Sequence, residues 1–501
     1  IGMAIQDVRV SRQGSQVYID SLLSDEAEPN LAVWNGARKQ IDEYISDSAI
    51  TDYHVRARSA SAIQIVFTAP QVPALGYRTF WVQALPAIEK VPIRLNPLVK
   101  FLLPMARLPL LQKLATRKRY ARPPYRIENE FFMVELRKDA SLTLLDKRCN
   151  QVYEGLNRIL DGGDCGDEYN YGPPAIDRLT SPCLKRVTLI RGPVQQSLEV
   201  EMELKSPLSL TPDRKSRSQE QVILPITTTI TLSKNVPRVD IRTALVNNAR
   251  DHRLRIHFPA PFTTNIGSQD GHFEVVDRRV ELPPFDDTWV EQPRPEVPQR
   301  AFTDVSDGKT GLMIANRGLP EVEVLKNAQG NAEIALTLLR CIGWLSRDDF
   351  STRKGHAGPF IETPGAQLPG QWFFDYSIIP HSGGWNTAFW QAYAFNNPLR
   401  AVSTGMHAGN LSSALSFVEA APETFVISAV KPTEVGHAWL VRGYNITDDP
   451  IRVTLKPWNP FKKVALVNLA EANQSPLQPD QSGCVTFPVR AHQIVSVVFQ
   501  P

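Results

Sequence analysis

The chain has 501 residues, 42% of them hydrophobic, with 55 Lys and Arg against 52 Asp and Glu and a formal net charge of +3. This length suffices for about two to four domains, and the near-neutral balance argues against a dedicated nucleic-acid-binding protein, which would carry a broad basic excess. The sequence contains no run of about 18 apolar residues, so we expect no membrane-spanning segment.

The first residues and the cysteines bear on the cellular compartment. The start lacks the charged n-region and the apolar core of a signal peptide, and position 1 is not methionine, so we expect the native start upstream. Five scattered cysteines, none with C-x-x-C spacing, argue against a metal site built on cysteine. We therefore predict reduced thiols in a cytoplasmic protein.

Residues 1–85 predict a small β-sandwich made of short strands. Ser61–Ala69 is rich in β-branched residues, and Gln71–Val82 places a Pro-and-Gly corner before another strand. Helical structure is an alternative only for the short stretch Asp42–Ser46.

Residues 86–126 form a basic apolar segment that we predict to be a linker or an insertion. Between Lys90 and Arg126 the sequence holds ten Lys or Arg and no acid, which leaves a net −7 for the rest of a +3 chain. Its prolines prevent one continuous helix. Docking on anionic lipid is an alternative for this segment, but we expect packing on the body of the protein or on a partner subunit for its leucines, among them Leu102, Leu103, Leu108 and Leu111.

Residues 127–501 predict a large all-β sandwich, with a terminal β-sandwich subdomain from about residue 420. Leu198, Val200, Met202 and Leu204 alternate with polar residues, as in a half-buried strand. The 40 prolines, ~8% of the chain against a usual ~5%, fit many corners between strands. Further strands are expected at Val222–Leu232, Val239–Val246, Glu333–Leu339, Phe425–Val430, Ile451–Leu455 and Ile494–Phe499.

The segment Asn157–Pro174 (N-R-I-L-D-G-G-D-C-G-D-E-Y-N-Y-G-P-P) combines acids, tyrosines, glycines and a double proline. The glycines and prolines predict a shaped loop. Carboxylates beside flat tyrosine faces suit a sugar, whose hydroxyls need acceptors and whose C–H faces need an apolar platform. A solvated acidic turn is the alternative. The acids are Asp161, Asp164, Asp167 and Glu168, and the tyrosines are Tyr169 and Tyr171.

A second candidate lies in Ile334–Gly358, where a buried strand is expected to end at Arg340. An arginine at a strand end can bind a carboxylate or sugar hydroxyls, and a local Arg–Asp pair that closes the next loop is the alternative. The sequence has no H-E-x-x-H, G-x-S-x-G, P-loop or G-x-G-x-x-G motif. Each of the nine histidines is therefore expected to be structural, and no complete active site is visible.

A series of short motifs runs in order from about residue 72 to the end of the chain. They are V-P-A-L-G-Y-R-T-F (Val72–Phe80), I-E-N-E-F-F (Ile127–Phe132), D-G-G-D-x-G-D-E-Y-N-Y-x-P-P (Asp161–Pro174), D-V-S-D-G-K-x-G-L (Asp304–Leu312), N-R-G-L-P (Asn316–Pro320), L-T-L-L-R-C-I-G-W-L-S-R-D-D (Leu336–Asp349), G-H-A-G-P (Gly355–Pro359), P-G-A-Q (Pro364–Gln367) and I-I-P-H-S-G-x-W (Ile378–Trp385). Together they resemble the C-terminal half of the family-38 glycoside hydrolases, the retaining, zinc-dependent α-mannosidases, and especially bacterial members.

The resemblance implies a small β-sandwich followed by a large galactose-mutarotase-like β-supersandwich. It places the zinc ligands, the nucleophile and the acid on an N-terminal barrel that this sequence lacks, so we expect no catalytic residue and no cofactor here and no activity of the chain alone. It implies two partners, an α-mannoside and the N-terminal catalytic domain, and leaves a homo-oligomer open. It assigns substrate binding to Tyr169, Tyr171, Asp167 and Arg340.

Two other functions stay open from the sequence. One is a stand-alone carbohydrate-binding or scaffold protein that kept the fold and lost the chemistry. The other is a mutarotase-like enzyme, which would need a histidine and an acid converging on a concave face, and no such pair can be named from the sequence.

Overall fold

The computed structural model describes residues 4–24, 30–59, 65–83, 122–405, 408–472 and 474–500. The chain divides into two compact units, residues 1–69 and 70–501. The predicted all-β class is confirmed, since strands dominate both units. Residues 84–121, which include most of the basic segment and its leucines, lie outside the described residues. No helix of the described part is long and apolar enough to cross a membrane.

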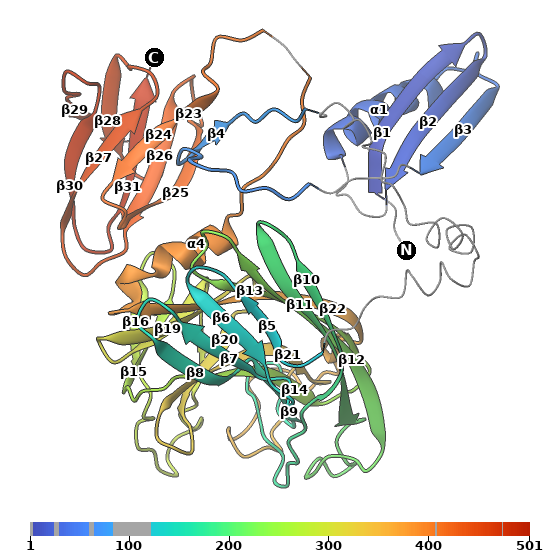
Figure 1. Ribbon diagram of the computed structural model, residues 1–501, viewed down its shortest axis with the longest axis vertical. Helices are drawn as coiled ribbons and strands as arrows, with labels where there is room; N and C mark the ends of the chain where they lie inside the picture. The colour runs from blue at the N-terminus through green and yellow to red at the C-terminus, as the bar shows by residue number, and fades with distance from the viewer. Residues whose placement is uncertain are drawn as a thin grey trace, which may run out of the picture. The chain divides into compact units, whose positions relative to one another are not determined.

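In its described residues, the first unit contains one three-stranded sheet and one helix (Figure 1). The central strand pairs antiparallel with the first strand and parallel with the third, which follows the helix. The small β-sandwich predicted for residues 1–85 is therefore wrong for the described part of this unit, which has a single sheet with a helix instead of two sheets. The elements are β1 Ala4–Gln13, β2 Gln16–Ser24, α1 Leu31–Ile45 and β3 Asp52–Ser59.

The 15-residue helix α1 corrects our expectation of a short helix at most. Asn30 caps its start, because the side-chain oxygen accepts a hydrogen bond from the Val33 N–H at 3.3 Å. Trp34, Ala37 and Ile41 recur at helical spacing and place apolar groups on one face. Of the predicted strand Ser61–Ala69, residues 65–69 are not in a strand, and the others lie outside the described part.

The second unit is built on a nine-stranded antiparallel sheet, in the order β10-β11-β12-β13-β22-β19-β18-β15-β16 (Figure 1). The predicted alternation is confirmed in β11, where Leu198, Val200, Met202 and Leu204 are buried. The strands are β10 Cys183–Arg191, β11 Gln195–Pro207, β12 Gln221–Ser233, β13 Val239–Asn247, β15 Ile266–Asp270, β16 Val275–Arg279, β18 Phe302–Ser306, β19 Thr310–Asn316 and β22 Gly370–Ser382.

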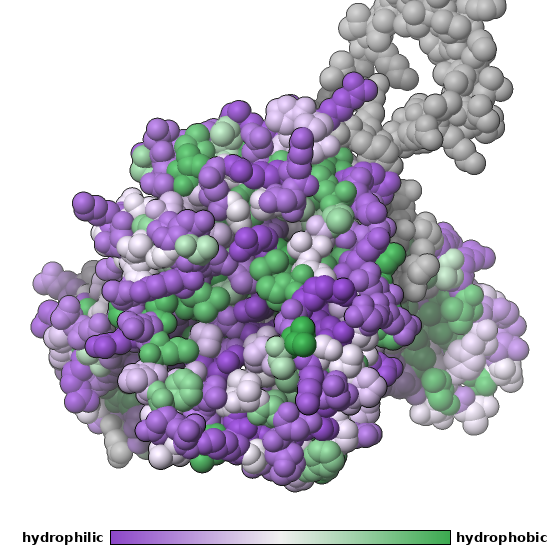
Figure 2. Space-filling view, turned by 90° about the horizontal axis from the view of Figure 1, so that it is seen from below, coloured by the Kyte–Doolittle hydropathy of each residue, from purple (hydrophilic) through white to green (hydrophobic). Residues whose placement is uncertain are grey.

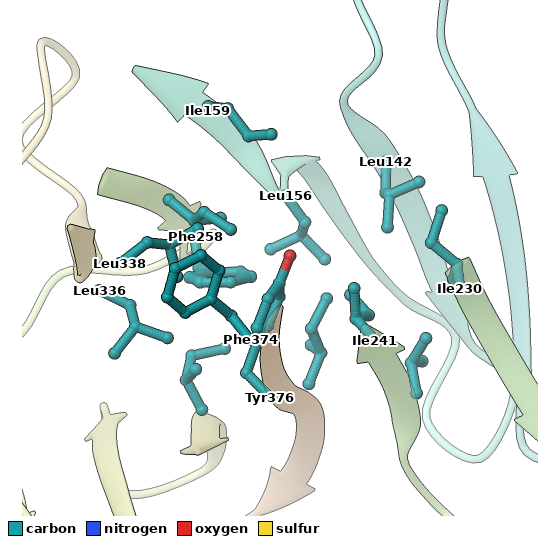
Figure 3. Close-up of a cluster of buried hydrophobic side chains, with 14 of the residues drawn as sticks. Leu142, Leu156, Ile159, Ile230, Ile241, Phe258, Leu336, Leu338, Phe374 and Tyr376 are labelled. Carbon is teal, nitrogen blue, oxygen red and sulfur yellow. The ribbon is translucent and has the colours of Figure 1, made fainter. Parts of the chain in front are cut away.

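Two further antiparallel sheets pack against this sheet and enclose the main core. One has the order β17-β20-β21-β14-β9 and the other β5-β6-β7-β8. Side chains from all three sheets meet in the core (Figure 3), so the predicted β-sandwich is confirmed. The strands are β5 Tyr125–Glu128, β6 Phe132–Leu136, β7 Leu142–Asp146, β8 Gln151–Leu156, β9 Arg158–Gly163, β14 His252–Pro259, β17 Glu296–Pro298, β20 Glu321–Lys326 and β21 Ala332–Cys341.

From Val418 onwards the strands form two sheets around a core of their own. A second apolar cluster, which includes Phe302, Phe389 and Tyr444, joins these strands to the larger sheets and to helix α4. The elements of this part and the helices before it are η2 Pro364–Gln367, η3 Trp385–Thr387, α4 Phe389–Asn396, β24 Val418–Ala421, β25 Phe425–Pro432, β26 Trp439–Asn445, β27 Ile451–Pro457, β28 Lys463–Val467, β29 Ser475–Leu477, β30 Val485–Val489 and β31 Ile494–Gln500.

The predicted strand Gln71–Val82 is shorter in the structure and belongs to the second unit. Only β4, Gly76–Arg78, is a strand, and it pairs with β23, Ala414–Ser416. A Cβ at Gly76 would lie 2.0 Å from the Leu415 carbonyl oxygen, so this close pairing requires glycine.

Candidate functional site

Three buried aspartates fix the conformation of the loop that follows β9. This strand lies at the edge of the five-stranded sheet, next to β14 (Figure 1), and the loop leaves it at Gly163. Asp161, Asp164 and Asp167 are all fully buried. Because a buried carboxylate is costly unless it is paired and hydrogen-bonded, the partners of these three residues define the loop.

Asp161 ties β9 to β14. Its Oδ1 lies 2.6 Å from His252 Nδ1, and its Oδ2 accepts hydrogen bonds from Arg217 Nη2 at 2.6 Å and from Ser206 Oγ at 2.8 Å. Burial opposes the charge on Asp161, but His252 and Arg217 outweigh burial and lower its pKa to about 2.

Asp164 fixes the loop to Arg340 at the end of β21. Its Oδ1 accepts two backbone N–H groups from within the loop. Its Oδ2 accepts a hydrogen bond from Arg340 Nε at 2.8 Å, and the same guanidinium donates to the carbonyl oxygens of Asp167 and Asn170. Arg340 therefore binds a carboxylate of its own chain. Its guanidinium connects three residues of the loop, Asp164, Asp167 and Asn170, on the inner side.

Asp167 makes the second buried ion pair of the loop, with Arg353. The guanidinium of Arg353 donates to both carboxylate oxygens. The N–H groups of Tyr169 and Asn170 donate to Oδ1, each at 3.0 Å, and the Arg347 N–H donates to Oδ2 at 2.8 Å. Burial opposes ionisation, but these hydrogen bonds outweigh it and hold the pKa of Asp167 below its ordinary value.

Tyr171 packs inwards against two guanidinium groups. The centroid of its ring lies 4.4 Å from the guanidinium carbon of Arg253 and 5.4 Å from that of Arg294. Burial raises the pKa of Tyr171 to about 12. Arg253 is itself buried and forms ion pairs with Glu296, Glu321 and Glu323.

Tyr169 is turned outwards, with 53% of its surface exposed. Next to it, the Glu168 N–H donates to the Trp344 carbonyl oxygen at 3.1 Å. The rings of Trp344 and Phe360 stack with centroids 4.4 Å apart, and the guanidinium carbon of Arg347 lies 4.7 Å from the Trp344 centroid. The loop thus presents aromatic faces to solvent on a base of buried ion pairs, which is an arrangement that can hold the C–H face of a sugar.

Comparison with known proteins gives two matches that share one family. Residues 127–351 match the "Glycosyl hydrolases family 38 C-terminal domain", and residues 424–497 match the "Glycosyl hydrolases family 38 C-terminal beta sandwich domain". The two matches together cover more than half of the chain. The chain belongs to glycosyl hydrolase family 38. It contains the C-terminal domains of this family, as the sequence motifs predicted.

Two kinds of relative support membership of family 38. The structure of an α-mannosidase from Enterococcus faecalis superposes with a TM-score of 0.65 at 29% identity, over 76% of this chain and 43% of that one. A protein from Halalkalibacterium halodurans, named provisionally as a mannosylglycerate hydrolase, is 28% identical over 64% of this chain and 36% of its own length. The chain thus spans less than half the length of each of these two relatives.

Within this family-38 loop, the four predicted substrate residues face different ways. Asp167, Tyr171 and Arg340 take part in the internal contacts of the loop, while Tyr169 is exposed. Substrate contact by any of them stays a prediction. The sequence analysis missed the partners that shape the site, because nothing local marks them. These are Arg217, Arg253, Arg353, Trp344 and Phe360.

Among the described residues, no three His, Cys, Asp or Glu side chains come together as a set that could hold a metal ion. The five cysteines are all free thiols, with Cys165 and Cys341 buried. Burial raises the pKa of Cys165 to about 11, so this thiol stays protonated at neutral pH.

Gly358→Ala is expected to displace the Tyr169 ring without unfolding the protein. The added methyl group would lie 2.8 Å from the Tyr169 hydroxyl oxygen and 3.2 Å from Cε2. Because an exposed tyrosine can rotate away, we expect stability to change by no more than about 0.5 kcal/mol. The ring resonances of Tyr169, assigned with Tyr169→Phe, should shift. Gly365→Ala is the control, since its Cβ would meet no atom within 4 Å. Equal spectra for both glycine variants would contradict the contact.

Proposed function

We propose that this chain is the C-terminal, substrate-contacting part of a retaining hydrolase of α-mannosides. The observation that supports this proposal is the position of Tyr169. Its side chain is exposed and lies next to the stacked rings of Trp344 and Phe360. The ion pairs Asp164–Arg340 and Asp167–Arg353 hold its loop in this position. A rigid aromatic surface supports sugar binding because it loses little entropy when the ligand binds. The names of the E. faecalis and H. halodurans relatives suggest a mannoside substrate.

In this proposal, bond cleavage takes place on a second domain. The nucleophile, the acid and the zinc ligands would lie on an N-terminal catalytic domain, which is the partner that family 38 implies. The loop of this chain would close one wall of the shared site. Asp167 and Arg340 would act by fixing the backbone around Tyr169, and Tyr171 would act as internal support.

A rim of exposed hydrophobic side chains around the loop supports docking of that catalytic domain. The segment before β17 runs beside the segment after Trp344, with Lys354 N–H donating to the Val290 carbonyl oxygen at 2.8 Å. Seen from below, the surface shows hydrophobic patches separated by hydrophilic residues (Figure 2). Exposed patches of this kind mark interaction sites. The exposed residues on these segments are Tyr169, Ile176, Leu179, Leu282, Phe285, Trp289, Val290, Phe360 and Ile361.

The two other functions receive less support. For a mutarotase-like enzyme, the pairs His252–Asp161, His257–Glu333 and His381–Asp304 are buried, while His356–Asp348 and His492–Asp448 are at least partly exposed. An accessible pair therefore exists, and it is the family-38 matches that favour the hydrolase over this alternative. A stand-alone carbohydrate-binding protein needs no catalytic domain. In that case no catalytic domain would cover the exposed hydrophobic rim.

Assay of the chain with and without a family-38 catalytic domain tests the proposal. With an aryl α-mannoside we expect no hydrolysis by the chain alone, with or without added zinc. Adding the N-terminal catalytic domain of the E. faecalis enzyme, fused or in trans, should give hydrolysis that a truncated control without this chain lacks. Hydrolysis by the chain alone that tracks bound zinc would overturn the division of roles.

In the fused protein, Tyr169→Ala should lower kcat/KM. The expected decrease corresponds to a loss of about 1–3 kcal/mol of transition-state stabilisation, the range for a lost ring contact or hydrogen bond. Phe373→Ala is the matched control, because Phe373 on β22 is equally exposed, at 52%, and lies outside the loop. If the two variants change kcat/KM equally, Tyr169 is an ordinary surface residue that does not contact the substrate.

A further inference from the structure

A pocket of about 510 Å³ lies where the turn between β19 and β20, the segment before β18 and helix α4 meet. This volume is in the range of small-molecule sites, roughly 300–1,000 Å³. One wall is the motif N-R-G-L-P, Asn316–Pro320, which takes no part in the loop around Tyr169. The lining residues are Gln299, Arg300, Ala301, Gly318, Leu319, Pro320, Tyr393, Asn396 and Asn397.

Hydrogen bonds between the three walls fix the shape of the pocket. Gln299 Nε2 donates to the Leu319 carbonyl oxygen at 3.0 Å, and Gln299 N–H donates to the Pro320 carbonyl oxygen at 2.9 Å. On the other side, Asn396 Nδ2 donates to the Asn316 carbonyl oxygen at 2.9 Å. A preformed pocket of this kind loses little entropy when a ligand binds.

Two of the lining residues, Arg300 and Tyr393, are held by the buried carboxylate of Asp270. Arg300 Nε donates to Asp270 Oδ2 at 3.1 Å, and Tyr393 Oη donates to Asp270 Oδ1 at 2.8 Å. Tyr444, from the C-terminal sandwich, lies 3.1 Å from the Tyr393 hydroxyl. Asp270 and Tyr444 are both 1% exposed, so Arg300 is held in place and its charge is balanced.

The remaining polar groups of the lining match hydroxyl groups. Within the described residues, Arg300 Nη1 and the side-chain oxygens of Asn396 and Asn397 have no hydrogen-bond partner in the protein. The pocket therefore offers guanidinium donors and amide acceptors, beside the apolar surfaces of Leu319 and Pro320. A hydroxyl both donates and accepts, so a polyol satisfies both kinds of group. A phosphate would face amide oxygens and an arginine whose charge is already paired.

We propose that this pocket binds a neutral saccharide, of one or two sugar units. The site uses none of the residues around Tyr169, so it does not rest on the function proposed above. It would give the chain a second carbohydrate contact, at the junction of α4, the large sheets and the C-terminal sandwich.

Saturation-transfer NMR with methyl α-mannoside on the full chain tests the pocket. The test variant is Asn397→Trp, which puts an indole into the pocket from an exposed position just after α4. The control is Ala394→Trp, which adds the same side chain at an exposed position of α4 that does not line the pocket. Both variants should melt within a few degrees of the parent.

We expect Asn397→Trp to weaken mannoside binding by about tenfold or more, equivalent to about 1.4 kcal/mol. Ala394→Trp should bind methyl α-mannoside within about twofold of the parent chain. Loss of binding in Tyr169→Ala with full binding in Asn397→Trp would overturn the pocket and leave the loop site intact. Absence of binding by the parent chain at high millimolar mannoside, or binding of inorganic phosphate in preference to mannoside, would also overturn it.

Discussion

Arg353→Met is expected to destabilise the second unit by about 3–5 kcal/mol, the cost of removing one partner of a buried ion pair. The Arg353 side chain is 2% exposed and Asp167 is fully buried. The same guanidinium donates to the carbonyl oxygen of Arg347 at 2.7 Å and to the side chain of Asn170. Methionine fills similar space but satisfies none of these acceptors, so a charged Asp167 would be left in the interior.

Arg137→Met is the matched control for this loss. Arg137 pairs with Glu154, but 47% and 64% of the two side chains are exposed, and such pairs contribute about 0–1 kcal/mol. Urea denaturation followed by tryptophan fluorescence compares the two variants. Limited proteolysis should in addition cut the Arg353→Met loop near Tyr169 first. Equal midpoints for both variants would show that the Asp167–Arg353 pair does not hold the loop.

The strands of the second unit could be predicted because their signal is local. In β11 and β12 the alternation of apolar and polar residues reports directly which face is buried. The predicted strands Ile451–Leu455 and Ile494–Phe499 lie within β27 and β31 for the same reason. Helix α1 was missed because Gly36 and the polar residues around it weaken its periodic pattern, and only the cap at Asn30 marks its start.

The site could be predicted only in part, because its residues obtain their roles from distant partners. The sequence places carboxylates and tyrosines in one loop. It does not distinguish a carboxylate that accepts sugar hydroxyls from one that accepts a guanidinium. Asp167 and Arg353 are 186 residues apart, and Asp164 and Arg340 are 176 apart. Tyr169 and Tyr171 look equivalent in the sequence, yet one is exposed and the other packs on Arg253.

The histidines also obtain their roles from partners that are distant in the sequence. The sequence analysis expected structural roles for all nine and named no partner. In the structure, His381 Nε2 lies 2.6 Å from Asp304 Oδ1, which joins two of the motifs that resemble family 38. His252 is enclosed more completely, since it is fully buried and both of its ring nitrogens have partners.

The geometry around His252 requires a protonated ring. Nδ1 lies 2.6 Å from Asp161 Oδ1, and Nε2 lies 3.1 Å from Asn247 Oδ1. The Asn247 amide is oriented by its Nδ2, which donates to the carbonyl oxygens of Gln367 and Leu368, so its Oδ1 is an acceptor. Asp161 is ionised, since its pKa is lowered to about 2, and can only accept. Both ring nitrogens therefore donate, which only the imidazolium can do.

Protonation of His252 predicts how stability depends on pH. Burial disfavours the charge, but Asp161 outweighs burial and raises the pKa of His252 from 6.5 to about 10. A raised pKa in the folded state means that the stabilisation is complete below pH 6.5 and is lost as the pH rises through 10. Asp161, with its pKa lowered from 3.8 to about 2, contributes fully above pH 3.8 and loses its contribution as the pH falls through 2.

The parent chain should therefore lose several kcal/mol of stability between pH 6.5 and 10, since each unit of pKa difference corresponds to about 1.4 kcal/mol. In His252→Gln the neutral amide cannot titrate, so this variant should be less stable at pH 6 and should depend much less on pH above it. His492→Gln is the control, because His492 is partly exposed and pairs with Asp448, which is 92% exposed. Urea midpoints at pH 6, 8 and about 9.5 give the three curves, and other groups titrate alike in all of them. Parallel curves for the parent and His252→Gln would mean that His252 is neutral in the folded protein, with Asp161 balanced by Arg217 alone.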